Sequence, residues 1–318
     1  MLRAAAVALF AFLLTAGPAI AGNGGVAPVG PASPNAQGIS DAYWLILAIT
    51  GVAFVVVETL LIVFLVKYRS RGRTRDVGGA QTHGNTRLEI GWTFIPVVLL
   101  AIVIGFVFAT LPDVEDAPAA GADLTVRVEG HQYYWLFEYP DGEIAVDQLV
   151  APVGRVVNLD VVAPDVIHSW WIPALGGKID AIPGRTNHTW FQAGRTGTFT
   201  GQCAELCGAQ HALMTASVKV VSDAEFQQFL ASHEPGSDAV GKETFEGVCA
   251  KCHGMDGQGT EAAPPIAGRD FDQATAAVIQ NGGAKMPPVG KDWSQEQIDA
   301  TLAYLNAPIR KGAPSYGG

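Results

Sequence analysis

The sequence predicts a membrane-anchored chain with a two-helix transmembrane hairpin, an all-β sandwich and a small all-α domain. Hydrophobic residues make up 49% of its 318 residues and charged residues only 16%, which is more apolar than an ordinary soluble protein. Two long apolar runs lie in the first third of the chain, short β-branched segments follow, and a helical pattern closes it. A chain of this length has room for two or three domains.

The N-terminus has the features of an export signal. Arg3 precedes an apolar run, and the small residues Ala19-Ile20-Ala21 follow it, so we expect residues 1–21 to be a cleaved signal peptide. An uncleaved anchor is the alternative. Residues 22–41 are rich in Gly, Pro, Ala and Asn and lack periodicity, which predicts a flexible N-terminal segment.

Residues 42–111 predict the transmembrane hairpin, with helices over about residues 42–66 and 92–111. Each run is apolar and long enough to span a bilayer at about 1.5 Å per residue. A basic cluster between the runs marks the cytoplasmic side, so both ends of the hairpin lie outside. The cluster comprises Lys67, Arg69, Arg71, Arg73 and Arg75.

Glu58 is an ionisable residue well inside the first apolar run. A charge at such a depth costs about 2.5–3.5 kcal/mol on the insertion scale, so the side chain should face another protein surface rather than lipid. Two roles stay open for it. One is an interhelical hydrogen bond with a partner subunit, and the other is proton conduction.

Residues 112–230 predict the β-sandwich, which an acidic connector precedes. Short β-branched segments show the partly alternating pattern of strands, and turn signals separate them. This pattern favours a sandwich over a helical domain. The clearest strand segments are residues 124–129, 155–162 and 217–221.

Soft metal ligands are concentrated between residues 201 and 214. Cys203, Cys207, His211 and Met214 fall within twelve residues, and thiolate, imidazole and thioether ligands select copper over hard cations. His168, flanked by apolar and aromatic residues, is a candidate for one more imidazole ligand. A disulfide, a packed histidine and a core methionine are the alternatives. Since the whole chain has only four methionines, chance explains this spacing poorly.

A second redox motif is the run Cys-Ala-Lys-Cys-His, which is the attachment motif of a c-type haem. In this reading Cys249 and Cys252 form thioethers and His253 binds the iron. A redox dithiol is the alternative for a bare Cys-x-x-Cys. The sixth iron ligand should be Met286, because Met255 is too close to His253 to reach the opposite face of the porphyrin.

Residues 242–311 predict the all-α domain around this motif. A linker containing Pro, Gly and Ser precedes it over residues 231–241, and residues 312–318 are expected to be disordered. Ser294 is the expected N-cap of a closing helix. The apolar face of that helix comprises Ile298, Leu302 and Leu305.

The net charge of −10 is carried largely by residues 112–234, where sixteen acidic side chains face six basic ones. An acidic surface disfavours nucleic acid as a partner and would attract a basic protein such as a soluble cytochrome. Plain solubility is the other explanation for it.

The copper motif closely resembles the binuclear copper A loop of cytochrome c oxidase subunit II. Residues 130–135, 168–170 and 180–185 resemble that family's other signatures, in the same order. The resemblance covers roughly residues 39–221 and implies a cupredoxin fold with two copper ions. The ligands that it implies are the bridging thiolates of Cys203 and Cys207, the imidazoles of His168 and His211, the weak ligand Met214 and the backbone carbonyl of Glu205.

The segment from residue 242 to 307 resembles a small class I cytochrome c, so the chain is most similar to subunit II of a caa-type oxidase. The resemblance implies that electrons pass from haem c to copper A and on to subunit I, which reduces oxygen to water and pumps protons. The implied partners are subunits I and III, membrane lipid, and a cytochrome bc complex or soluble cytochrome c as donor. The implied location is the bacterial cytoplasmic membrane, with both centres on the periplasmic side.

Further roles follow only from the resemblance. The Glu205 carboxylate would bind a magnesium ion shared with subunit I, and Glu89 would lie near the entrance of a proton path into subunit I. Tyr133 and Trp135 would form the electron entry. The family commonly has tryptophan where this chain has Tyr133, which is either a neutral aromatic swap or a sign that a tethered haem has relaxed the demand for a docking surface.

Three alternative functions stay open at this point. A copper A nitric oxide reductase subunit belongs to the same superfamily. This sequence separates it poorly from an oxidase subunit, because the catalytic metals lie in another chain. A copper-delivery or thiol redox protein would need neither Met214 nor a fused haem. A quinol oxidase subunit resembles this fold but lacks the copper ligands, so their presence here argues against it.

Overall fold

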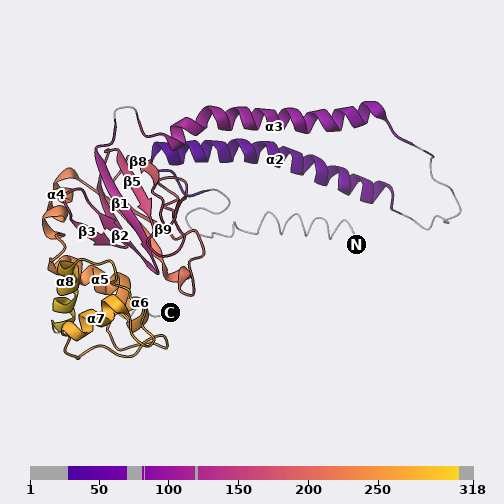
Figure 1. The fold of residues 1–318 in the computed structure, drawn as a ribbon. Helices are drawn as coiled ribbons and strands as arrows, with labels where there is room; N and C mark the ends of the chain where they lie inside the picture. Colours follow the sequence, from indigo (N-terminus) through magenta and orange to yellow (C-terminus); the bar gives the residue numbers. More distant parts are fainter. Residues whose placement is uncertain (1–27, 70–80, 82, 119–120, 308–318) are drawn as a thin grey trace. The chain divides into compact units, whose positions relative to one another are not determined.

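The structure is a computed structural model that describes residues 28–69, 81, 83–118 and 121–307 (Figure 1). The expected signal peptide over residues 1–21 and the expected disordered tail over residues 312–318 lie outside the described residues. The chain forms two compact units. Residues 37–114 make up one of them, and the residues before and after this segment make up the other.

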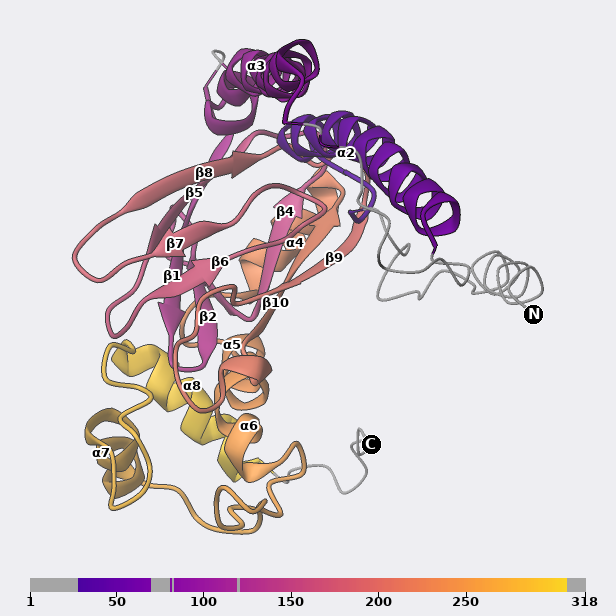
Figure 2. The same cartoon turned by 90° about the vertical axis from the view of Figure 1, so that its right-hand side faces the viewer.

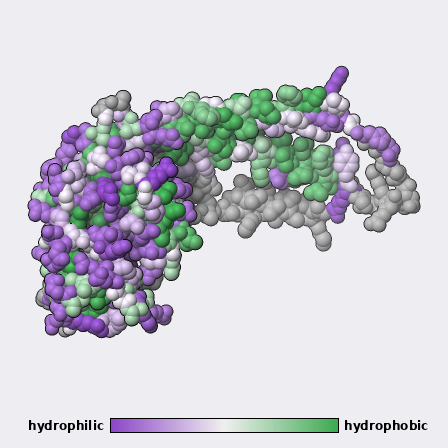
Figure 3. Space-filling view, viewed as in Figure 1, coloured by the Kyte–Doolittle hydropathy of each residue, from purple (hydrophilic) through white to green (hydrophobic). Residues whose placement is uncertain are grey.

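The unit of residues 37–114 contains all but the outermost residues of two long apolar helices, α2 (Pro34–Lys67) and α3 (Thr86–Glu115). Their mean hydropathies of 2.7 and 2.8 and their lengths suffice to cross a membrane, and their visible surface is largely hydrophobic (Figure 3). Both helices are longer than expected, because polar residues extend the hydrogen bonding beyond the apolar runs. At α3, Glu89 accepts a hydrogen bond from the Asn85 amide, 3.0 Å away, which caps the helix upstream.

Part of the N-terminal segment that was expected to be flexible is fixed. Ala32 exchanges backbone hydrogen bonds with Ala174 and Gly194 at 2.7 and 2.9 Å. The buried side chain of Asn35 donates to the Trp190 carbonyl at 2.6 Å. The expectation for residues 22–41 is therefore corrected for these residues. Composition alone does not reveal backbone groups that pair with a distant loop.

The second unit contains the expected sandwich (Figures 1 and 2). Its larger sheet has the strand order β3-β2-β1-β5-β8, a three-stranded sheet has the order β4-β10-β9, and β6 pairs with β7. The bounds are β1 Leu124–His131, β2 Tyr134–Glu138, β3 Ile144–Val146, β4 Gln148–Pro152, β5 Val157–Val162, β6 His168–Trp170, β7 Ile179–Ala181, β8 Asn187–Phe191, β9 Gly197–Gln202 and β10 Thr215–Val221.

The sandwich core lies between the sheets, because alternate residues of the strands turn inward. In β1 the side chains of Val126 and Val128 are fully buried between more exposed neighbours. The three strand segments expected from the sequence correspond to β1, β5 and β10. The predicted all-β class of this domain is confirmed.

The C-terminal domain is helical, with α5 (Asp238–Thr244), the π-helix η2 (Phe245–Cys249), α6 (Ala250–His253), α7 (Gln273–Asn281) and α8 (Gln295–Asn306). Helix α8 is the expected closing helix. The Ser294 hydroxyl accepts a hydrogen bond from the Gln297 amide at its N-terminus, and its predicted apolar face is buried.

The connection between the two domains differs from the expected linker over residues 231–241. Helix α4 (Asp223–Ser232) covers its start and α5 covers its end, which leaves residues 233–237 between the helices. The sequence analysis missed α4, although the pair Ser222 and Glu225 forms a capping box at its N-terminus. A Ser-x-x-Glu pattern before apolar residues is a usable signal for such a helix.

The sandwich and the helical domain share an apolar cluster. Trp293 donates from Nε1 to the Tyr134 hydroxyl at 2.8 Å, and that hydroxyl donates to the Val289 carbonyl at 3.2 Å. The helical domain is therefore packed against the sandwich rather than held only by a tether. The buried members of the cluster are Tyr134, Leu136, Ile144 and Val146 from the sandwich, with Val240, Val248, Ala276, Ile279, Trp293, Ile298 and Leu302 from the helical domain.

Candidate metal centres

The first candidate centre lies in the loop between β9 and β10. These strands pair antiparallel, with Gln202 opposite Thr215. At the base of the loop the Cys203 amide donates to the Met214 carbonyl at 2.9 Å. The hairpin therefore brings together the two ends of the motif, which are eleven positions apart in the sequence.

The donor atoms of the motif converge inside this loop. His211 Nδ1 lies 3.4 Å and Met214 Sδ lies 3.8 Å from Cys207 Sγ. The carbonyl oxygen of Glu205 lies 3.2 Å from Cys203 Sγ. The structure thus gathers the ligands of the loop on two thiols, as a binuclear site with bridging thiolates requires.

His168 reaches the same place from β6, far away in the sequence. Its Nδ1 lies 3.9 Å from Cys203 Sγ, and its ligand atom and the two thiols all lie within 4.8 Å of one another. His168 and Met214 are fully buried, and both cysteines are nearly so. Water is therefore largely kept from the donor atoms.

The donors fit copper. Both cysteines are free thiols, so the disulfide alternative does not apply to this structure. Burial opposes ionisation of Cys203, but hydrogen bonds with His168 and the Glu205 backbone outweigh it and lower its pKa to about 7. Burial and the nearby Cys203 raise the pKa of Cys207 to about 12. Two neighbouring thiols do not readily ionise together, because the two thiolates repel each other. A bound metal cation relieves this repulsion and favours the doubly ionised pair.

Asp165 fixes the orientation of His168. The imidazole Nε2 donates to Asp165 Oδ1 at 2.9 Å, and because a carboxylate can only accept, Nδ1 carries the free lone pair that faces Cys203. A carboxylate behind a ligating histidine is a common device at metal sites. The sequence analysis missed Asp165, whose position three residues before His168 was the available signal.

Gln132 contacts both segments that carry the candidate ligands. Its backbone N–H donates to Asp165 Oδ2 at 2.7 Å, and its side-chain Nε2 donates to the Cys207 carbonyl at 2.5 Å. The neighbouring Gly130 leaves room for His168, since a Cβ there would lie 3.0 Å from the imidazole ring. The segment of residues 130–135 therefore supports the site from behind.

The two residues expected at the electron entry have different surroundings. The Tyr133 hydroxyl, partly exposed, accepts a hydrogen bond from the Ala209 amide at 3.1 Å. Trp135 is fully buried and packs edge-on against Trp170 and His168, with ring centroids 5.2 and 6.0 Å away. A docked protein can approach Tyr133, but it cannot touch Trp135.

The second candidate centre is formed by α6 and the residue before it. His253 donates from Nδ1 to the Pro264 carbonyl at 2.7 Å, which leaves Nε2 free to bind a metal. Cys249 and Cys252 lie one helical turn apart, and both are free thiols, as covalent attachment requires. These features fit the covalent haem c that the motif predicts.

Met286 is the better placed of the two candidate methionines. It packs against the apolar cluster of the helical domain, whereas Met255 is 40% exposed. A hollow of about 410 Å³ is lined by residues 258–265 and by Lys285. It therefore lies between the segment that holds His253 and the residue before Met286.

The acids assigned by resemblance are separate from these ligand clusters. The Glu205 carboxylate is exposed, while its carbonyl faces Cys203. Glu89 serves as a capping residue of α3. Glu58 is exposed on α2. The structure gives none of these three carboxylates a metal-ligand cluster among the described residues.

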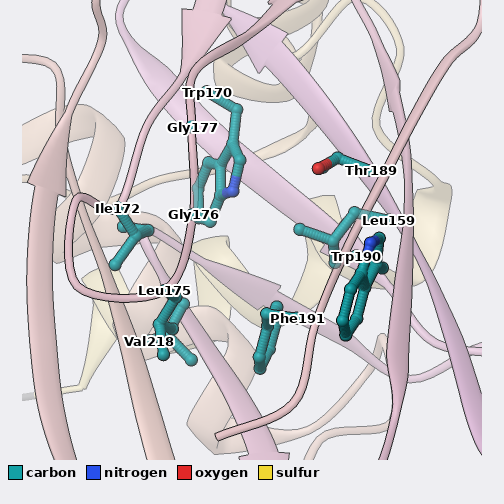
Figure 4. Close-up of a pocket in the computed structure, with 10 residues that line it drawn as sticks. All are labelled: Leu159, Trp170, Ile172, Leu175, Gly176, Gly177, Thr189, Trp190, Phe191 and Val218. Atoms are coloured by element: carbon teal, nitrogen blue, oxygen red, sulfur yellow. The ribbon is translucent and has the colours of Figure 1, made fainter. Parts of the chain in front are cut away.

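A small apolar pocket lies inside the sandwich. The pocket in Figure 4, between Leu159, Trp170 and Phe191, has room of about 10 Å³, which is about one water molecule. Its lining is apolar apart from the hydroxyl of Thr189 and the two indole nitrogens of Trp170 and Trp190. This pocket is too small to bind a substrate.

Comparison with known proteins agrees with this assignment. Residues 27–109 match "Cytochrome C oxidase subunit II, transmembrane domain" and residues 143–221 match "Cytochrome C oxidase subunit II, periplasmic domain". Residues 236–305 match "Cytochrome C oxidase, cbb3-type, subunit III". The three matches follow the same order as the hairpin, the sandwich and the helical domain.

Curated relatives cover most of the chain. Cytochrome c oxidase subunit 2 of Alkalihalophilus pseudofirmus is 34% identical over 308 residues, which is 87% of this chain and 89% of the relative. The protein of the same name from Cereibacter sphaeroides is 36% identical, over 65% of this chain and 79% of the relative. A crystal structure of the periplasmic domain of subunit II from Bradyrhizobium japonicum is 42% identical, covering 36% of this chain and 94% of that chain with a TM-score of 0.35.

Proposed function

The chain belongs to the cytochrome c oxidase subunit II family, and we propose that the residues converging on Cys203 and Cys207 hold its copper A centre. The observation that carries this proposal is the meeting of two buried thiols with two imidazole Nδ1 atoms, one from the loop and one from β6. The proposed ligand set is His168, Cys203, Glu205 through its carbonyl, Cys207, His211 and Met214.

The protein is the electron-transfer subunit of an oxidase, anchored in the membrane with its sandwich on the periplasmic side. When bound, the copper pair and haem c each supply a one-electron couple. The chain contributes largely buried ligands. Hydrogen bonds from His168 to Asp165 and from Gln132 to the Cys207 carbonyl fix their positions. Since rigid ligands move little when charge changes, this support favours fast electron transfer.

Haem c is proposed to be held by the α6 segment. Cys249 and Cys252 supply the thioether sulfurs, and His253 supplies Nε2 on one side of the iron. Met286 is the proposed ligand on the other side. The spacing of the two free thiols and the hydrogen bond that leaves Nε2 of His253 available support this assignment.

We also propose the domain limits that follow from these roles. The hairpin occupies residues 42–111, the copper A domain residues 112–230 and the cytochrome c domain residues 242–311. The order of helices and strands supports this division, with helical residues now extending into the linker over residues 231–241.

Membership in the family implies a complex with subunit I, the acceptor of the electrons. We propose that the exposed Glu205 carboxylate contributes to a magnesium site at that contact, and that Glu89 and Glu58 belong to a proton path. Subunit III and a cytochrome bc complex or soluble cytochrome c are the proposed further partners. The relatives give no support to a nitric oxide reductase or copper-delivery role.

Electron paramagnetic resonance of the full-length chain, loaded with copper and haem, tests the proposal. Two coppers that share one unpaired electron give hyperfine splitting from two equivalent nuclei. Pyridine haemochrome spectra should show one c-type haem per chain. Splitting from a single copper nucleus, or a chain with no covalent haem, contradicts the proposed function.

A further inference from the structure

Gln210 connects the two candidate centres. Its side-chain Nε2 donates to Cys252 Sγ at 3.2 Å, and its Oε1 lies 3.5 Å from the same sulfur. The next residue in the chain is His211, whose Nδ1 faces Cys207. A single residue therefore separates the proposed haem-bearing sulfur from a proposed copper ligand. A thioether sulfur still accepts a hydrogen bond, so the contact from Nε2 is compatible with an attached haem.

Lys251 anchors the same face of the helical domain to the sandwich. It lies between the two attachment cysteines, and its Nζ contacts Asp147 Oδ2 at 2.5 Å and the Tyr133 carbonyl at 2.8 Å. The side chains of Lys251 and Asp147 are only 15% and 21% exposed. An ion pair with so little exposure holds a defined geometry, because either charge without the other would be poorly solvated.

The sandwich side of this anchor is itself rigid. Asp147 Oδ1 accepts a hydrogen bond from the Trp135 amide at 2.9 Å, and the Asp147 amide donates to the Trp135 carbonyl at 2.9 Å. Burial raises the pKa of Asp147, and the contact with Lys251 opposes that rise. Lys251 therefore meets a carboxylate that cannot move without breaking backbone contacts.

At Gly247 the helical domain approaches the sandwich so closely that a residue with a side chain would not fit. A Cβ on Gly247 would lie 2.5 Å from Val146 Cγ1 and 3.1 Å from Asp147 Oδ2. On the other side of this contact the Val146 amide donates to Glu243 Oε2 at 3.1 Å. This hydrogen bond crosses the interface and reports whether the domains are docked.

We propose that Gln210 is a positioning residue that joins the haem domain to the copper loop, with Lys251, Asp147 and Gly247 fixing the domain in the orientation that this bridge needs. The inference rests on the proposed function of both centres. One electron crosses the bridge and no atom or proton moves with it. The haem attached through Cys252 would be oxidised, and the copper centre that includes His211 would be reduced.

This arrangement gives Tyr133 a role inside the chain. Its hydroxyl supports the copper loop and its carbonyl receives Lys251. The backbone of Tyr133 is thus engaged by the chain's own haem domain, while the residue stays partly exposed. The idea of a haem on a flexible tether is replaced by a docked haem domain.

The test compares variants of the full chain carrying both metal groups. Gln210→Ala removes the bridge, and Gln202→Ala is the matched control, because Gln202 is an exposed glutamine that directly precedes Cys203. The haem is reduced by a short light pulse, and the rate at which the copper centre becomes reduced is followed optically. Hydrogen exchange of the Val146 amide measures docking independently of electron transfer.

Gln210→Ala should slow the intramolecular transfer about tenfold or more, with Val146 protection and both spectra unchanged. Gln202→Ala should change neither reading. Gly247→Val, and Lys251→Met as a variant without added bulk, should lose Val146 protection and slow the transfer together.

Equal rates of copper reduction in the Gln210 and Gln202 variants would overturn the proposed bridge. It would also be overturned if Gly247→Val or Lys251→Met lost Val146 protection without slowing the electron transfer. These outcomes differ from failure of the proposed function. In that case the unmodified chain would lack the copper or the haem signal from the start.

Discussion

His168 and Asp165 form a carboxylate–imidazole pair in which Nε2 lies 2.9 Å from Asp165 Oδ1, and this pair sets which nitrogen faces the thiols. The pair is partly buried, with His168 fully inaccessible and Asp165 about one-third exposed. The proposed copper site therefore depends on a residue that is not itself a proposed ligand.

Asp165→Asn should weaken copper binding. An amide can donate as well as accept, so it no longer requires the tautomer with a free Nδ1 on His168. Loss of such a partner typically reduces metal affinity by about 10–100-fold. Competition with a chelator measures the affinity. Asp160→Asn, which removes the exposed partner of His188, is the control and should bind copper as the unmodified chain does.

Serine substitutions should separate the two centres. Cys207→Ser should abolish the binuclear signal, because two bridging thiolates are required, and should leave the haem spectrum intact. Cys252→Ser should keep the binuclear signal and remove one thioether. The two spectra are recorded on the same preparations. A binuclear signal in Cys207→Ser would show that this thiol is not a bridge.

Lys251→Met should destabilise the packed unit by about 2–4 kcal/mol, since it leaves the Asp147 carboxylate partly buried without its cation. Denaturant unfolding, followed by haem absorbance, gives the free energy. Lys242→Met is a matched control in the same domain. Its lysine is 57% exposed and pairs with Glu246 at 3.8 Å, so its loss should cost below about 1 kcal/mol. Equal losses in both variants would contradict a special role for the Lys251 pair.

Local patterns were sufficient to predict the fold class and the cluster of candidate ligands in the loop between β9 and β10. Cys203, Cys207, His211 and Met214 lie in one loop, so their spacing already describes the site. The alternating strands and the closing helix were likewise readable from the sequence. These features depend on neighbours within a few turns or strand positions.

The supporting contacts were not predictable, because they join distant residues. Gln132 reaches Asp165 and Cys207 across 33 and 75 positions, and Lys251 reaches Asp147 across 104. A lysine inside the Cys-x-x-Cys motif gives no sign of its partner. For the same reason the apolar residues of β3 could not be assigned to a domain interface before the fold was known.

Glu129 should contribute to stability only above its folded-state pKa. Burial raises that pKa, but hydrogen bonds with His131 and Arg127 outweigh burial and hold it below the ordinary value of 4.5. A carboxyl with a lowered folded pKa stabilises the protein above its unfolded pKa, and this contribution is lost as pH falls through the folded value. Glu129→Gln should therefore flatten the acid limb of a plot of unfolding free energy against pH. An unchanged acid limb would show that Glu129 does not contribute.

The two ends of Glu205 should be separable by mutation. Its carbonyl lies 3.2 Å from Cys203 Sγ, whereas its carboxylate is exposed, and a side-chain substitution leaves the carbonyl in place. In the complex with subunit I, Glu205→Ala should therefore retain both coppers and lose bound magnesium or manganese, because these ions prefer oxygen ligands.

Elemental analysis of the purified complex measures both kinds of metal at once. Glu234→Ala removes another exposed acid and should retain every metal. If Glu205→Ala loses copper and keeps the hard metal, the roles of its carbonyl and carboxylate are reversed. If it keeps both, the magnesium site does not use Glu205, while the assignment of the copper ligands stands, because it rests on the thiols and imidazoles of the loop.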